Sequence, residues 1–174
     1  MVEEPDPDWW MERNGKIESG SIVFLPSSKR LSNYPAYIYD HPVLVFEVFP
    51  APIKGSETHA WVCLITSRSN RWFRADDPKH ILFNHPEHDG YLPHECGQAC
   101  SGLLCLEDGS RMRRECYLNI KEIHRVPFAR LRPFRDRSIK LAAASLSYVF
   151  EKASEVIANS LFTVPYRARA ATAT

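Results

Sequence analysis

Four side chains that could bind a metal ion lie between residues 94 and 105, namely His94, Cys96, Cys100 and Cys105. Thiolate and imidazole are the ligands of tetrahedral zinc sites, so this segment is a candidate zinc site. The usual pairs of cysteines separated by two residues are absent, and Cys105 lies in an apolar run where a buried thiol is ordinary. We therefore expect no cofactor, and free thiols in place of a disulfide framework, with zinc as the alternative.

Thr66 and Ser67 end the apolar run at 60–67 and form a second candidate group. Two hydroxyls at the end of a strand can face a substrate, or they can bond to nearby backbone groups. Both interpretations stay open at this point. The polar and aromatic connection at 27–40 is long for a compact domain, and such loops are often functional, so we interpret it as a candidate substrate loop.

Arginines gather in the second half of the chain and form its densest positive cluster: Arg111, Arg113, Arg114, Arg125, Arg130, Arg132, Arg135 and Arg137. Tyr117, Phe128 and Phe134 are interleaved with them and could stack on the bases of single-stranded RNA. The alternative is a solvated rim whose aliphatic stems cover apolar surface. The formal net charge of +1 does not decide between the two.

Three apolar segments rich in β-branched and aromatic residues predict strands at 21–26, 41–50 and 60–67. Their continuous apolar character favours a small barrel or a covered sheet. The Asp108-Gly109 dipeptide predicts a tight turn and a hairpin. A further strand at 116–120 leads toward a short helical turn bracketed by Pro127 and Pro133.

A change of period indicates an amphipathic helix from Ser138 to about Leu161, with Ser138 as its N-cap. Its apolar stripe recurs at intervals of three and four residues and must pack on the sheet or on a second subunit. The stripe consists of Ile139, Ala142, Leu146, Val149, Phe150, Ala153, Val156 and Ile157.

The 174 residues are enough for one domain with a core, and 44% apolar and 25% charged residues are ordinary for a globular protein. We expect a flexible lead at 1–15, a single domain at 16–162 with an inserted loop region at about 68–101, and a disordered tail at 163–174. Trp9 and Trp10 in the lead are either a latch onto the domain or a partner-binding pair. The N-terminus lacks the pattern of a secretory signal, and no apolar run is long enough for a membrane span, so we expect a cytoplasmic or nuclear protein and no membrane partner.

The order of these segments resembles the MazF/PemK class of toxins from bacterial toxin-antitoxin systems, and fungal proteins with such a domain. In that class a G-D-I-V strand precedes a loop, then R-P-x-L-V, then a strand ending in I-T-S, and later a D-Q-x-R-T-x-D segment and an R-L pair before a helix. The counterparts here are "GSIV" at 20–23, "HPVLV" at 41–45, "CLITS" at 63–67, and "EIHR" at 122–125 followed by Arg130-Leu131. The resemblance covers about 20–67 and 116–158.

The resemblance implies a mainly β (α+β) fold, a small SH3-like β-barrel with a C-terminal amphipathic helix, and a homodimer. It also implies a metal-independent endoribonuclease that cleaves single-stranded RNA with the ribose 2′-OH as nucleophile. By position, Arg30, with Lys29 as its alternative, and Thr66 would act at the phosphate, with Ser67 beside them. His41 and His124 could serve as acid or base because an imidazole titrates near neutral pH.

Departures from the family pattern support a second function. His41 replaces the family's Arg before Pro, Lys121 and Glu122 stand where the family has Asp-Gln, and the strand before them lacks the Arg-x-Asp pair. The loss of that carboxylate favours a domesticated, non-catalytic barrel that acts as a protein-interaction module and binds a protein partner or inhibitor. If the chain binds RNA instead, we expect contacts from Lys29, Arg68, Arg111, Arg113 and Arg125.

Overall fold

The structure is a computed structural model that describes residues 17–27, 36–49, 57–67, 74, 77, 79–84, 102–133 and 139–160, with side chains only as far as Val156 at the end of the last helix. The expected lead at 1–15 and tail at 163–174 lie outside the described residues, as does most of the expected loop region at 68–101.

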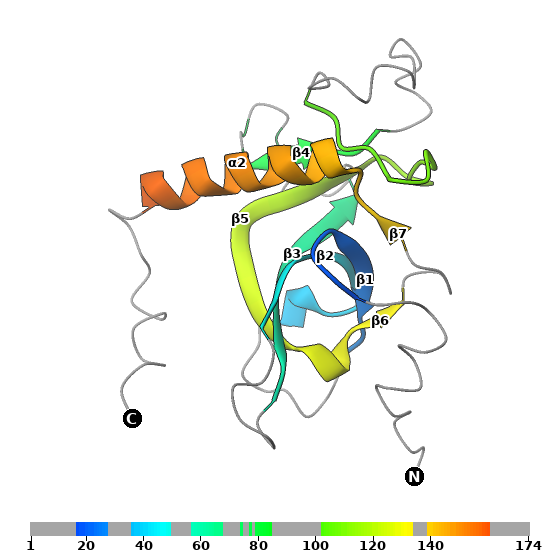
Figure 1. The fold of residues 1–174 in the computed structure, drawn as a ribbon, viewed down its shortest axis with the longest axis vertical. Helices are drawn as coiled ribbons and strands as arrows, with labels where there is room; N and C mark the ends of the chain where they lie inside the picture. Colours follow the sequence, from blue (N-terminus) through cyan, green and yellow to red (C-terminus); the bar gives the residue numbers. More distant parts are fainter. Residues whose placement is uncertain are drawn as a thin grey trace.

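The described chain is mainly β, with one C-terminal helix, as the sequence predicts (Figure 1). All ladders are antiparallel, and the strand order is β4-β5-β3-β2-β1-β6, with β7 also paired to β1. Among the described residues this path is open, running from β4 to β6. The elements are β1 (Ser21–Leu25), η1 (Ala36–Ile38), β2 (His41–Phe49), β3 (His59–Ser67), β4 (His80–Leu82), β5 (Cys116–Pro127), η4 (Phe128–Arg130), β6 (Arg132–Pro133), β7 (Ile139–Lys140) and α2 (Ala143–Ser160).

The sheet has an apolar cluster on each face because its central strands are apolar in both registers. On one face, Cys63 and Ile65 of β3 and Leu118 of β5 pack with Val149 and other residues of α2. On the other face, Val62 of β3 packs in a separate cluster that includes Val43, Val126 and Ile38 of η1. We call these the helix face and the open face, because α2 does not cover the second; the centre of the open face is nevertheless buried, with η1 and η4 packed on it. Since side chains alternate along a strand, each remaining residue can be assigned to one face.

Two irregularities bend the sheet. In β2 the register shifts between Val45 and Glu47, so Phe46 is an extra residue in this strand. The Phe46 ring meets the Phe150 ring of α2 edge-on, with 5.0 Å between the ring centroids. In β5 the partners change from Ile123 opposite Cys63 to Asn119 opposite Leu64, which leaves 120–122 as a wider bulge. Figure 1 shows β5 curving strongly beneath α2. Bulges raise the local twist and redirect side chains, and they are frequent beside functional sites.

The expected hairpin around Asp108-Gly109 is wrong, although the turn itself is present. Gly109 has a positive φ of 69°, and its N–H donates to the carbonyl of Leu106 at 3.1 Å. The segment before the turn does not pair with β5. Leu104 bridges to Phe83 and Leu106 bridges to Leu141, because these apolar side chains join the helix-face cluster. The short helical turn between Pro127 and Pro133 is confirmed as η4.

The C-terminal helix begins at Ala143, five residues later than expected, so Ser138 is not its N-cap. Ile139 and Lys140 instead pair with β1 as strand β7, and pairing satisfies their backbone groups outside a helix. The buried hydroxyl of Ser145 accepts a hydrogen bond from the N–H of Cys105 at 2.8 Å, which fixes the first turn of α2 against the segment at 102–106.

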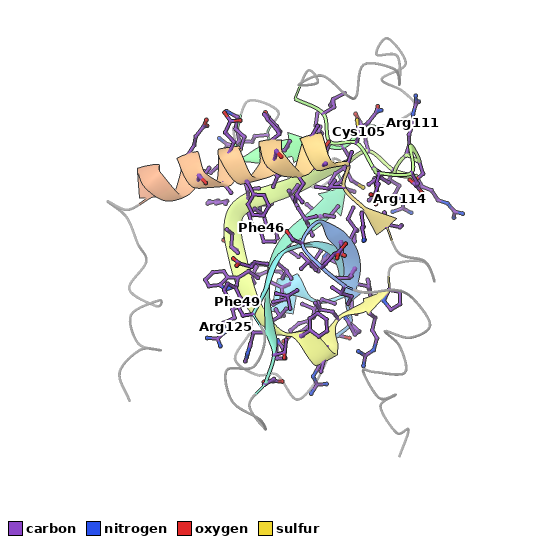
Figure 2. All side chains as sticks on the ribbon, in the orientation of Figure 1. Phe46, Phe49, Cys105, Arg111, Arg114 and Arg125 are labelled. Atoms are coloured by element: carbon purple, nitrogen blue, oxygen red, sulfur yellow. The ribbon has the colours of Figure 1, made fainter. Side chains whose placement is uncertain are left out.

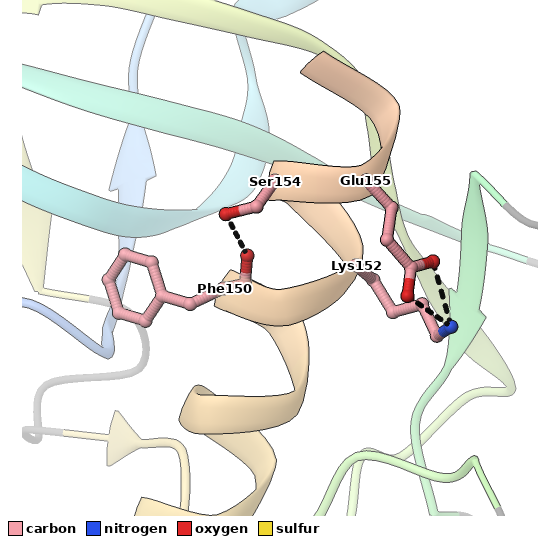
Figure 3. Close-up of polar contacts among 4 residues, drawn as sticks. All are labelled: Phe150, Lys152, Ser154 and Glu155. Atoms are coloured by element: carbon pink, nitrogen blue, oxygen red, sulfur yellow. Dashed lines mark hydrogen bonds and ion pairs between the residues drawn. The ribbon is translucent and has the colours of Figure 1, made fainter. Parts of the chain in front are cut away.

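The two sides of α2 differ as its amphipathic pattern predicts, and Figure 3 shows polar contacts of its more exposed residues. Leu146, Val149, Ala153 and Val156 pack on the helix face. On the exposed side, Lys152 pairs with Glu155 at 2.9 Å, and the Ser154 hydroxyl donates to the carbonyl of Phe150 at 2.8 Å. The apolar side of α2 therefore packs on the sheet, and its polar side carries these contacts.

Gly20 offers a test of this packing against a matched control. Its φ is +88°, and a Cβ there would lie 3.1 Å from Leu146 Cδ2, whereas Gly109 has a φ of +69° and open space around it. We expect Gly109→Ala to lower the free energy of unfolding by about 1–2 kcal/mol for the backbone alone. Gly20→Ala should lose about 1–3 kcal/mol more through overpacking. Urea unfolding of both variants measures the difference, and equal losses would contradict the close contact between Gly20 and α2.

Candidate functional site

Thr66 lies near the end of β3 on the open face, opposite Tyr117 of β5. Its side chain hydrogen-bonds to the phenol of Tyr117. The ring of His80, from β4, lies against the Tyr117 ring with 4.7 Å between centroids. Three strands therefore bring one hydroxyl, one phenol and one imidazole together. These groups can donate, accept or transfer a proton at one place on the open face.

Tyr117 is the buried member of this group, with 1% of its surface exposed. Burial raises the pKa of the Tyr117 phenol, and the hydrogen bond with Thr66 partly offsets that effect. The phenol consequently keeps its proton at neutral pH and acts there as a hydrogen-bond partner, not as an anion. This contact with a buried side chain holds the Thr66 side chain in place.

His41 lies on the same face as Thr66 and at the same end of the sheet. It begins β2, which runs antiparallel to β3, and alternation from Val43 puts it on the open face. Just before it, Asp40 has a positive φ of 60°. The Asp40 carboxylate accepts a hydrogen bond from the backbone N–H of Ser27 at 2.9 Å. The backbone N–H of Asp40 donates to the carbonyl oxygen of Leu25. The two ends of the candidate substrate loop are therefore fastened together beside His41.

Ser67 does not share a face with Thr66. It pairs with Cys116, and alternation along β3 puts it on the helix face. Arg30 and Lys29, the phosphate-binding candidates of the loop, lie outside the described residues, and so does Arg68. Of the expected catalytic residues, the structure thus brings Thr66 and His41 to one face and directs Ser67 to the other.

A second group of polar side chains lies further along the open face, at the β5 bulge. The Tyr37 hydroxyl, from η1, donates to Glu122 Oε2 at 2.5 Å. His124 Nε2 lies 3.5 Å from the same oxygen, and the rings of His124 and Tyr37 meet edge-on at 6.1 Å. We call Tyr37, Glu122 and His124 the bulge triad. His124 is 13% exposed at its side chain, and its Nε2 is buried without a hydrogen-bond partner.

The bulge triad has an unusual charge state. Partial burial, and then the hydrogen bond and charge of Glu122, raise the pKa of Tyr37 to about 12. Burial lowers the pKa of His124, and the Glu122 charge opposes that shift without cancelling it. At neutral pH the phenol and the imidazole are consequently both neutral. The triad then contains one charge, the carboxylate of Glu122.

The expected RNA-binding arginines do not form one surface (Figure 2). Arg111 and Arg114 lie at one side of the molecule, in the segment before β5, whereas Arg125 lies at the opposite side beside Phe49. Arg125 is paired with Trp61, and its guanidinium Nη2 is 3.4 Å from His59 Nδ1. Arg113 lies two residues from Arg111 and is exposed. A single RNA strand would therefore contact these arginines at separate places on the protein surface.

Of the four candidate metal ligands, the structure describes Cys105. Cys105 is disulfide-bonded, so the expectation of a free thiol is wrong there, and a disulfide sulfur cannot act as a thiolate ligand. His94, Cys96 and Cys100 lie outside the described residues. Cys63 is free and buried, and burial raises the pKa of its thiol. Among the described residues no three His, Cys, Asp or Glu side chains are grouped as a metal site requires.

Comparison of the chain with models of protein families and with curated proteins gives no match. In the part of the chain that the structure describes, no helix is both long and apolar enough to cross a membrane.

Sequence reasoning missed His80, Tyr117, Tyr37 and Glu122 as members of a site. His80 falls in a region interpreted as loop, although the alternation of Ile81 and Phe83, both buried, is a short strand signal. Tyr117 was considered only as a stacking ring for RNA. Glu122 and Tyr37 are 85 positions apart, and only the bulge in β5 and the fold of η1 bring them together. No local pattern in the sequence predicts the contact between Tyr37 and Glu122.

The raised pKa of Tyr37 predicts a pH effect on stability. A group whose pKa is higher in the folded state contributes stability that is complete below its unfolded pKa of 10.0 and is lost as the pH rises through about 12. We expect the free energy of unfolding to fall between these values, and Tyr37→Phe to flatten that fall. Urea unfolding at several alkaline pH values measures it. Tyr148→Phe is the control, and an unchanged alkaline slope in Tyr37→Phe would contradict the contact with Glu122.

Proposed function

We propose that this chain is a divergent MazF/PemK-like domain that binds single-stranded RNA on the open face and cleaves it without a metal ion. The observation that carries the proposal is the contact of Thr66 with Tyr117 and of Tyr117 with His80, at the strand end where the resemblance expects a catalytic threonine. The mainly β fold with a C-terminal helix agrees with an SH3-like barrel. Closure of that barrel is part of the proposal.

The chemistry requires groups that this face carries. Cleavage through the ribose 2′-OH needs a base for that hydroxyl, an acid for the leaving 5′-oxygen and donors for the phosphate oxygens. The Thr66 hydroxyl can donate its one proton to a phosphate oxygen when the protonated phenol of Tyr117 donates to the Thr66 oxygen. His41, on the same face, has the imidazole needed to protonate the leaving oxygen. Arg30 and Lys29 of the adjoining loop would supply positive charge.

Thr66→Ala tests the proposal. In EDTA, wild-type protein should convert a mixed-sequence single-stranded RNA into fragments with 2′,3′-cyclic phosphate and 5′-hydroxyl ends. We expect Thr66→Ala to lower the cleavage rate by about 100-fold, the usual cost of one transition-state donor. Mapping of the fragment ends and a gel-based rate measurement give both results.

Thr58→Ala is the matched control, because Thr58 lies just before the opposite end of β3. It should cleave at the wild-type rate. An equal loss in both variants would mean a structural effect, and melting temperatures identify that case. A folded wild-type protein that leaves the RNA intact would overturn the proposed function.

A second function, the protein-interaction module, is favoured by an aromatic strip on the helix face. Phe49, Trp61 and Phe150 are 40%, 39% and 39% exposed, and the rings of Phe49 and Trp61 meet edge-on at 6.3 Å. Exposed aromatic groups of this kind mark interaction surfaces. The strip carries Glu47 and Arg125, both directly paired with Trp61. These opposite charges suit a two-fold contact with a second copy of this chain.

Sedimentation of the purified protein over a range of concentrations tests whether the aromatic strip is a contact between two copies of this chain. We expect a dimer for the wild-type protein and a monomer for Trp61→Glu, because a carboxylate in an apolar contact is not solvated. Tyr37→Glu, which changes a ring that is 53% exposed on the open face, should remain a dimer. A dimeric Trp61→Glu variant would exclude the strip as the dimer contact.

A further inference from the structure

Polar side chains continue along β5 from Tyr117 to the bulge triad, on the open face of the sheet. Asn119 lies between them, and it shares the open face because it pairs with Leu64 of β3. Its side-chain oxygen accepts a hydrogen bond from the backbone N–H of Lys121 at 2.9 Å, within the bulge. A line of polar groups thus joins Tyr117 to the bulge triad.

The bulge triad is too far from Thr66 to act on the same phosphate. His124 pairs with Val62, four residues before Thr66 on β3, which is about 13 Å along an extended strand. An RNA strand that is held at Thr66 and follows β5 would therefore place a neighbouring nucleotide at the triad, not the one that is cleaved. Groups at that distance can select the RNA sequence without taking part in bond cleavage.

The triad has the two parts of a site for a single base. The Tyr37 ring is accessible, and exposed aromatic rings stack on the bases of single-stranded RNA. The Glu122 side chain is 46% exposed, and no lysine or arginine pairs with it in the described part of the chain. A carboxylate repels phosphate, so the part of an RNA that Glu122 can bind is a base with N–H donors.

The contacts within the triad fix the ring and the carboxylate relative to each other. The Tyr37 hydroxyl donates to Glu122 Oε2 at 2.5 Å. The His124 ring meets the Tyr37 ring edge-on, and its buried Nε2 lies 3.5 Å from the same carboxylate oxygen. A base that stacks on Tyr37 would therefore meet the Glu122 carboxylate with its edge.

Guanine fits this carboxylate best among the four bases. A carboxylate only accepts hydrogen bonds, and its two oxygens retain acceptor capacity after one of them has bonded to Tyr37. Guanine presents two neighbouring N–H donors, at N1 and N2, which can bond to both oxygens at once. Adenine and cytosine present one amino group beside an acceptor nitrogen, and uracil presents one N–H between two carbonyl oxygens. In those three bases an acceptor would face the carboxylate and repel it.

We propose that Tyr37 and Glu122 form a guanine site that sets the sequence preference of RNA binding on the open face, an inference that rests on the proposed function. The guanine base stacks on the Tyr37 ring and donates from N1 and N2 to the Glu122 carboxylate. His124 is a positioning residue that lies against both side chains and does not touch the base. No bond is made or broken at this site, so a binding measurement tests it.

Fluorescence anisotropy of the full chain with short 2′-O-methyl RNAs tests the guanine site, because these RNAs bind without being cleaved. Each RNA is a uridine strand with one central guanosine, adenosine or cytidine, and the all-uridine strand is the reference. We expect the guanosine RNA to bind about 10-fold to 100-fold more tightly than the others, the usual discrimination of a bidentate contact. Inosine lacks only the N2 amino group, so its RNA should bind about 10-fold more weakly than the guanosine RNA.

Two variants separate base selection from stacking. In Glu122→Gln the amide oxygen still accepts from Tyr37, but the amide nitrogen is a donor that opposes the guanine N–H groups, so the guanosine RNA should bind no better than the others. Glu155→Gln removes the same charge from the exposed side of α2 and should keep the wild-type preference. Tyr37→Ala removes the stacking ring and should weaken binding of every RNA by about 10-fold. Melting temperatures check that each variant is folded.

The outcomes distinguish the guanine site from the proposed function. If wild-type protein binds all the RNAs equally, or if folded Glu122→Gln keeps a preference for guanosine, the guanine site is wrong and RNA binding on the open face stands. If the folded wild-type protein binds none of the RNAs, the proposed function fails, and the guanine site fails with it. A preference that is lost equally in Glu155→Gln would also overturn the site, because it would show a general effect of removing negative charge.

Discussion

The pairing of β3 with β5 is the interaction on which the rest of this structure depends. Every residue of β3 has a partner on β5, and Cys63, Ile65 and Leu118 at its centre are completely buried. Because apolar side chains cover both faces, this pair cannot slip by one residue without moving buried groups into water. The register that results puts Thr66 opposite Tyr117. It also places the β5 bulge within reach of η1, where Glu122 meets Tyr37.

The two faces of this pair have different chemistry, and the proposed functions follow that division. The helix face is apolar where α2 packs on it and carries exposed aromatic rings, Phe49 and Trp61, outside that cluster. The open face is apolar at its centre but carries hydroxyl, phenol, imidazole and carboxylate groups along β3, β4 and β5. Proton transfer therefore suits the open face, and association with another chain suits the helix face.

The sequence predicts the central strands well because their signal is local. β-branched runs such as "SIVFL" give the strand positions directly, and Thr66 follows as the end of one of them. The start of α2 is not predicted, because Ile139 fits a helical stripe but pairs with β1, and Leu141 next to it pairs with Leu106. The bulge triad is not predictable in the same way. A bulge of three residues changes which face a side chain occupies, and nothing in "NIKEIH" marks where the alternation breaks.

The most direct test of the account is where RNA contacts the protein. We would record backbone amide spectra of isotope-labelled protein while adding a 2′-O-methyl RNA, which binds but cannot supply the nucleophile. The account predicts shifts that centre on Thr66, Tyr117 and His80, with little change at Trp61 and Phe49. Shifts confined to the aromatic strip, or no shifts at RNA concentrations that saturate other single-strand binders, would contradict it.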